Sequence, residues 1–193
     1  MSDNRKLQGE RGESIVRRQL ARLDSNSYVV LNNYCFEYEN QTTQIDHLIL
    51  SVYGIFVIET KNYSGKLEIN IESSEWTYYR VNANSGKVSD KGIKVINPYK
   101  QNDYHINLLS RILGVEKSKF ANMVVLADKN ITLNEGTEDY ILWYDELITY
   151  IQRASKHLFT LQEISKMLTQ LKKHLCSEEY HLKRVKGGKK KRG

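Results

Sequence analysis

The sequence of 193 residues has a single proline, only two cysteines and no long apolar run. With no proline-rich or glycine-rich stretch between residues 10 and 175, nothing indicates a linker, and one continuous domain is predicted. The longest apolar runs, such as Ile55 to Ile58, are far shorter than the roughly 20 residues that a membrane helix needs. No apolar segment follows the polar amino terminus, so we expect no signal peptide, no membrane partner and a cytoplasmic location.

The two cysteines, Cys35 and Cys176, are far apart in the sequence and have no partners at metal-ligand spacing. They therefore indicate neither a disulfide framework nor a zinc site, and we expect two reduced thiols. Hydrophobic residues make up 40% of the chain, which is enough to build a core and excludes disorder for most of it.

The net charge of +6 comes from one end of the chain. After Leu182 there are seven basic and no acidic side chains, namely Lys183, Arg184, Lys186, Lys189, Lys190, Lys191 and Arg192. Removing them leaves 22 basic against 23 acidic residues, so the rest of the chain is nearly neutral. Residues 177–193 are predicted to be a disordered tail behind a domain at 9–176 and an N-terminal extension at 1–8. The tail is either a solubilising end or an electrostatic anchor for nucleic acid.

Apolar periodicity predicts alternating strands and helices over most of the chain. Helices are expected at about 10–23, 98–113, 145–156 and 161–176, the second between a cap at Asn97 and a stop at Gly114. Strands are expected at 28–38, 44–52, 55–61, 121–127 and 140–143, with a more exposed hairpin ribbon at 66–72 and 76–82. This order fits an α/β sandwich with a central mixed β-sheet flanked by helices.

The hairpin between the second and third strands gathers charged side chains. A tight turn at Tyr53-Gly54 would place Asp46 opposite Lys61, with Glu59 on the same face and diagonal to Asp46. One interpretation is a buried Asp46–Lys61 ion pair with Glu59 turned to solvent. The other is a site for Mg²⁺ or Mn²⁺, because a hard cation prefers oxygen ligands and offsets the cost of burying carboxylates.

Two further polar side chains are predicted to face the core. The apolar stripe of the first helix, which includes Val16 and Leu20, projects back to Glu13. The stripe of the second helix includes Gln101 and His105. His105 is interpreted as a core histidine, with a catalytic role as the less favoured alternative.

Several motifs in this order resemble the NERD (nuclease-related domain) family: Gly12-Glu13, Ile45-Asp46-His47, the segment from Gly54 to Asn62, Trp76, and Asn97-Pro98 with Gln101. The resemblance covers roughly residues 9 to 114. It implies membership of the PD-(D/E)xK nuclease superfamily and hence a restriction-endonuclease-like sandwich. The usual Pro-Asp dipeptide is absent, since Ile45 precedes Asp46.

The resemblance implies a nuclease that hydrolyses phosphodiester bonds in DNA with Mg²⁺ or Mn²⁺, in DNA processing or defence. Asp46, Glu59, the carbonyl of Thr60 and Glu13 would hold the metal. Lys61 would orient or deprotonate the attacking water, and Gln101 would hold substrate or the water network. A binding module that keeps the fold without turnover is the first alternative, and an RNase with the same site is the second.

Outside this constellation the signals are weaker. Trp76, Tyr78, Tyr79 and Arg80 put aromatic rings beside a cation, a pattern that either stacks on unpaired bases or, as the favoured reading, packs across strands. The late helices carry amphipathic faces that include Leu161, Ile164, Leu168, Leu171 and Leu175. These faces either cover the sheet or contact a second copy or a partner protein.

Overall fold

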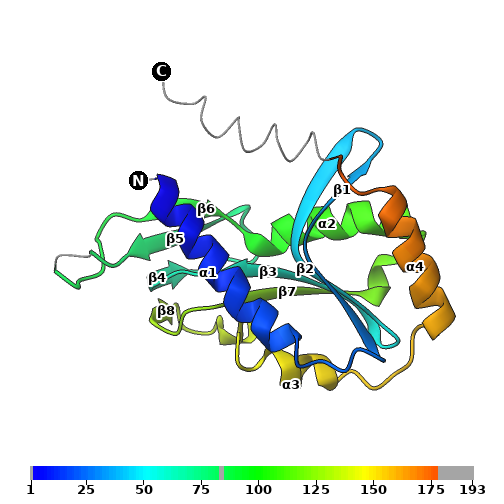
Figure 1. Cartoon of the computed structure of the whole chain (residues 1–193). Helices are drawn as coiled ribbons and strands as arrows, with labels where there is room; N and C mark the ends of the chain where they lie inside the picture. Colours follow the sequence, from blue (N-terminus) through cyan, green and yellow to red (C-terminus); the bar gives the residue numbers. More distant parts are fainter. Residues whose placement is uncertain (1, 83–84, 178–193) are drawn as a thin grey trace.

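The computed structural model describes residues 2–82 and 85–177, and its centre is a five-stranded mixed sheet (Figure 1). The strands lie in the order β1, β2, β3, β7, β9, with bounds Tyr28–Tyr38, Gln41–Ser51, Gly54–Lys61, Phe120–Leu126 and Leu142–Trp143. The first three strands are antiparallel, whereas β7 and β9 run parallel to β3. The predicted α/β sandwich with a central mixed sheet is therefore confirmed.

Helices cover both faces of this sheet (Figure 1). Helices α1 (Ser2–Leu20) and α3 (Leu147–Gln152) pack on one face, where Val16 and Ile151 share a core with Ile58. Helices α2 (Pro98–Leu113) and α4 (Leu161–Lys173) pack on the other, and short 3₁₀ turns occupy Lys117–Lys119 and Glu138–Tyr140. In the described part of the chain, no helix is both long and apolar enough to cross a membrane.

The helix ends follow local chemistry closely. Asn97 caps α2 by accepting the Tyr99 N–H at 2.9 Å, and Gly114 ends the helix with a left-handed φ of 64°. Thr160 and Glu163 form a capping box on α4. Helix α1, in contrast, begins at Ser2 instead of about Glu10. The sequence did not predict this first part because Leu7 is the single large apolar residue among residues 2–9, so no apolar stripe marks them as helical.

The turn between β2 and β3 differs from the prediction. Ser51 pairs with Gly54, so the turn residues are Val52 and Tyr53, and the register shifts by two residues. The Ser51 hydroxyl stabilises this turn, donating to the Gly54 carbonyl at 2.9 Å and accepting the Tyr53 N–H at 3.2 Å. Gly54 has a φ of 146°, which side chains rarely tolerate.

The predicted ribbon is not an exposed appendage but half of a second sheet. This sheet has the order β6, β5, β4, β8, with bounds Ile93–Ile96, Glu75–Arg80, Gly65–Glu68 and Ile131–Leu133. Leu67, Trp76 and Tyr78 are buried in a third core together with Leu126. Trp76 is 1% exposed, so cross-strand packing is confirmed for it and stacking on bases is excluded.

The expectation of two reduced cysteines is wrong, because Cys35 and Cys176 form a disulfide across 141 residues of sequence. After α4 the chain runs back along β1, where Phe36 and Leu175 form a bridge and the Cys176 N–H donates to the Cys35 carbonyl at 3.0 Å. Tertiary pairing thus brings together two thiols that the sequence leaves far apart.

The buried face of α4, formed by Ile164, Met167 and Leu171, covers the sheet.

Candidate active site

The predicted polar residues meet in a cleft of about 690 Å³ at the carboxyl end of β3. Residues 59–61, the last three of β3, supply its floor, and Asp46 of β2 lies beside them. One wall is helix α1, with Gln8 and Glu13, and the opposite wall comes from the second sheet. The cleft is therefore built where the two sheets and α1 converge.

Glu59 is the centre of this arrangement and is only 3% exposed. Its Oε1 accepts a hydrogen bond from Lys61 Nζ at 2.5 Å, and its Oε2 lies 3.8 Å from His105 Nε2. Lys61 Nζ also lies 3.5 Å from Gln101 Oε1. The structure thus brings Gln101 and His105 of α2 to the Glu-x-Lys pair, as their position on the inner stripe of the helix predicted.

These contacts set the charge states of the pair. Burial by itself raises the pKa of Glu59, but the nearby His105 ring and Lys61 ammonium outweigh it, so the pKa is lowered. Burial would lower the pKa of Lys61, but the Glu59 carboxylate overcomes it and the pKa is raised. Glu59 is therefore held as a carboxylate and Lys61 as an ammonium at neutral pH.

Asp46 differs from the predicted geometry. The two-residue shift of register removes its pairing with Lys61, and its Oδ2 instead accepts the backbone N–H of Thr60 at 2.9 Å. Burial, followed by repulsion from Glu59, raises the pKa of Asp46 to about 7. Asp46 and Glu59 are therefore two carboxyl groups that resist being ionised together, and the Asp46–Lys61 ion pair is not formed.

The position of Glu13 depends on a close approach between α1 and the end of β3. A Cβ at Gly12 would lie 2.7 Å from the Asn62 Cβ, so only glycine permits this contact. Gln8 and Asn62 lock the helix in place, each donating a side-chain N–H to the other's backbone carbonyl, at 2.8 and 2.7 Å. Glu13 is half-buried beside Glu59, and burial raises its pKa.

His105 is a buried core histidine, as the sequence predicted, and it lies beside the candidate site. It is 5% exposed, its Nδ1 is hydrogen-bonded to the Thr43 hydroxyl, and its Nε2 has no hydrogen-bond partner within residues 2–82 and 85–177. Its spacing of four residues from Gln101 was the available signal, because such residues share a helix face.

Removal of the Asp46 charge is expected to change how stability depends on pH in metal-free buffer. Because the pKa of Asp46 is higher in the folded than in the unfolded chain, the folded state holds this proton more tightly. The free energy of unfolding should therefore fall as pH rises from about 4 to about 7, and the fall should be smaller in Asp46→Asn. Urea denaturation with EDTA at several pH values measures this difference, and identical pH profiles would contradict it.

The donor set fits a hard divalent cation. Glu59 Oε2 is buried and, in the described part of the chain, accepts no hydrogen bond. A cation there would also relieve the repulsion that raises the pKa of Asp46. Within the described residues no group of three or more His, Cys, Asp or Glu side chains is close enough to form a metal site. That is compatible with Mg²⁺, which is commonly held by one or two carboxylates and several waters.

The predicted nucleic-acid-binding residues of the tail, from Lys183 to Arg192, lie outside the described residues. The remaining predicted site residues, namely Glu13, Asp46, Glu59, Thr60, Lys61 and Gln101, all lie in or beside the cleft.

A mixed sheet between helices, with a buried Glu-x-Lys pair on one strand and an aspartate on the next, defines a nuclease-like α/β sandwich. The chain belongs to the nuclease-related domain (NERD) family, whose sequence model matches residues 8–127. It is also 29% identical over 188 residues to an uncharacterized protein of Bacillus anthracis, an alignment that covers 94% of this chain and 84% of that protein. No solved structure gives a significant match.

Proposed function

We propose that this protein is a Mg²⁺- or Mn²⁺-dependent deoxyribonuclease of the PD-(D/E)xK type that hydrolyses phosphodiester bonds. The observation that carries the proposal is the buried Glu59–Lys61 pair, with Asp46 beside it and an unpartnered Glu59 oxygen among the described residues. Burial of charged groups is costly, so a charged cluster without a bound ligand would lower the stability of the fold without serving a function. Membership of a nuclease-related family supports the same function.

Each side chain of the site has its own proposed role. Asp46 and Glu59, with the carbonyl of Thr60, would hold the cation, and Glu13 would hold one of its waters. When bound, the cation would polarise the scissile phosphate and acidify water. The Lys61 ammonium, kept charged by Glu59, would stabilise negative charge that develops on the phosphate. Gln101, 3.5 Å from Lys61 Nζ, would position the ammonium or the water.

His105 joins this proposal as a positioning residue. With Nδ1 engaged by Thr43, its Nε2 faces Glu59 Oε2 at 3.8 Å. The imidazole would thereby hold the orientation of the Glu59 carboxylate. Such outer contacts commonly orient metal-binding groups.

A binding module without turnover is the second candidate. It is favoured by the Glu59–Lys61 contact of 2.5 Å, in which the ammonium occupies one oxygen of the would-be metal ligand. In that case the cleft would recognise nucleic acid through its cations alone.

The deciding experiment is an incubation of the purified full chain with linear and plasmid DNA, single-stranded DNA and RNA. Each substrate is tested with Mg²⁺, with Mn²⁺ and with EDTA. We expect cleavage of DNA with either metal and none with EDTA. Cleavage that persists in EDTA would contradict the metal dependence, and cleavage of RNA alone would replace the deoxyribonuclease with an RNase. Binding without any cleavage would favour the binding module.

A further inference from the structure

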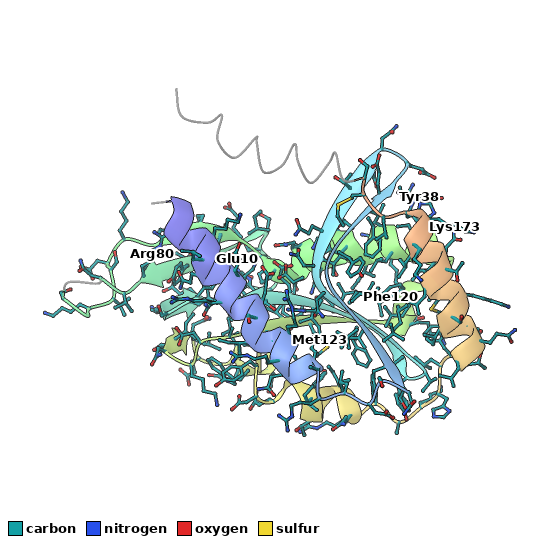
Figure 2. The ribbon with its side chains drawn as sticks, viewed as in Figure 1. Glu10, Tyr38, Arg80, Phe120, Met123 and Lys173 are labelled. Atoms are coloured by element: carbon teal, nitrogen blue, oxygen red, sulfur yellow. A yellow bond between two sulfur atoms is a disulfide. The ribbon has the colours of Figure 1, made fainter. Side chains whose placement is uncertain are left out.

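The wall of the cleft opposite α1 combines a cation with exposed apolar side chains. It is formed by residues of β5, β6 and the segment after β3, including Tyr63, Arg80, Val81 and Ile93. Figure 2 labels Arg80 near the amino-terminal half of α1, whose Gln8 and Gly9 line the same cleft. The wall thus continues directly from the catalytic floor towards the mouth of the cleft.

In the described part of the chain, Arg80 supplies a cation that has no carboxylate partner. Among residues 2–82 and 85–177 it forms no ion pair, and its guanidinium lies 6.0 Å from the Tyr78 ring centroid. The Tyr78 ring stacks on Tyr63 with centroids 4.5 Å apart, which connects Arg80 to the surroundings of Lys61. Lys61 and Arg80 both act electrostatically on the Tyr63 phenol, whose pKa burial raises. Lys61, Tyr63, Tyr78 and Arg80 all line the cleft, so the two cations and the stacked rings belong to one surface.

The same wall exposes apolar surface. Val81 is 39% exposed and Ile93 is 37% exposed, and both line the cleft. An apolar surface beside a cation suits a nucleotide strand, whose phosphates seek the cation while its sugars and bases cover the apolar groups. A duplex keeps its bases stacked inside and presents phosphates outward, so it would leave this apolar surface uncovered.

The depth at which the catalytic groups are buried also favours a single strand over a duplex. The Glu59 side chain is 4% exposed and the Lys61 side chain 18%, so both lie at the bottom of the cleft and not on its rim. A phosphate must enter the cleft to reach them, and a flexible single strand or strand end enters a cleft more readily than a duplex, which is wider and stiffer. The 690 Å³ volume is that of a pocket for a small ligand, within the usual 300–1,000 Å³.

We infer that the wall formed by Tyr63, Arg80, Val81 and Ile93 is a binding site for a single nucleic acid strand next to the scissile phosphate. Arg80 holds a neighbouring phosphate, and Val81 and Ile93 cover the sugar and base. The inference rests on the proposed nuclease function and narrows its substrate to unpaired strands or strand ends.

The chain offers matched pairs of variants for the test. Arg80→Gln removes the cation of the wall, and Lys91→Gln removes an exposed cation that does not line the cleft. Ile93→Ser removes apolar surface from the cleft side of β6, and Ile96→Ser does so at a 64% exposed position outside the cleft on the same strand. All are made in the full chain that also carries Asp46→Asn, so that the bound strand stays intact in the presence of Mg²⁺.

Affinity is measured by fluorescence anisotropy with a labelled oligothymidylate and with a blunt DNA hairpin of similar charge. We expect Arg80→Gln and Ile93→Ser to weaken binding of the oligothymidylate by about 5- to 100-fold, and Lys91→Gln and Ile96→Ser to leave it unchanged. Ile93→Ser should not change the affinity for the hairpin. Equal affinities of all four variants for the oligothymidylate, or tighter binding of the hairpin than of the single strand, would overturn the inference.

Failure of this inference and failure of the proposed function give different results. If Arg80→Gln binds the oligothymidylate as before while the wild-type chain cleaves DNA, the proposed single-strand binding site is wrong and the proposed nuclease function is retained. If binding depends on Arg80 and Ile93 but the wild-type chain cleaves nothing, the single-strand binding site is retained. The proposed nuclease function is then replaced by that of a binding module.

Discussion

Replacement of Asp46 by asparagine is expected to lower the rate of DNA cleavage by about 100- to 10,000-fold while the fold persists. Asparagine keeps an oxygen that accepts the Thr60 N–H, which Asp46 accepts at 2.9 Å, so the local backbone contact is retained. It removes the negative charge that would bind the cation. It also removes the repulsion from Glu59, so stability in metal-free buffer above pH 7 should rise by about 1 kcal/mol or more.

The opposite signs of these two effects make the variant informative. A residue with a purely structural role would lose stability and activity together. Single-turnover cleavage at saturating Mg²⁺ measures the rate, and urea denaturation measures the stability. The matched control is Asp90→Asn, which removes an exposed carboxylate that does not line the cleft and should change neither quantity. Wild-type cleavage by a folded Asp46→Asn protein would eliminate Asp46 from the site.

The companion variants Glu59→Gln and Lys61→Gln should lose activity to a similar extent. Each leaves its buried partner without a counter-charge, because Lys61 Nζ and Glu59 Oε1 are 2.5 Å apart. Both single variants should therefore also lose stability, unlike Asp46→Asn. This contrast distinguishes Asp46, whose charge is proposed to bind the cation, from Glu59 and Lys61, whose opposite charges already neutralise each other.

Loss of the disulfide between Cys35 and Cys176 is expected to have the largest effect on stability. The bridge closes a loop with a sequence separation of 141 residues, so its removal gives the unfolded chain much more freedom. For a loop of this length the free energy of unfolding should fall by about 3 to 5 kcal/mol. The chain after α4 also loses its tether to β1, where the Cys176 N–H donates to the Cys35 carbonyl.

The measurement compares urea denaturation of the oxidised chain, of the chain treated with a reductant, and of the Cys35→Ser/Cys176→Ser variant. The reduced chain and the variant should be similarly destabilised. Addition of the reductant to the double variant is the control and should have no effect. Two titratable thiols in the chain purified without reductant would show that the bridge does not form.

Local sequence determined those features that depend on neighbours along the chain. The cap at Asn97, the proline after it and the stop at Gly114 define α2 by satisfying or removing backbone groups at its ends. Side-chain alternation determined which residues of β2 and β3 share a face. The observed register differs from the expected one by two residues, an even number, so Asp46, Glu59 and Lys61 stay on one side although their pairing changes.

Tertiary structure decided what depends on contacts between distant segments. Strands β6 and β8 are only four and three residues long, so they carry no periodicity of their own, and they exist because β5 and β4 offer free edges. The sequence marks Gly12 as part of a family motif, but the reason for a glycine there is the close contact of α1 with Asn62. The pairing of Cys35 with Cys176 follows from the chain returning along β1. In each case the stabilising energy is gained only after the chain has closed a long loop, and no short window of sequence contains it.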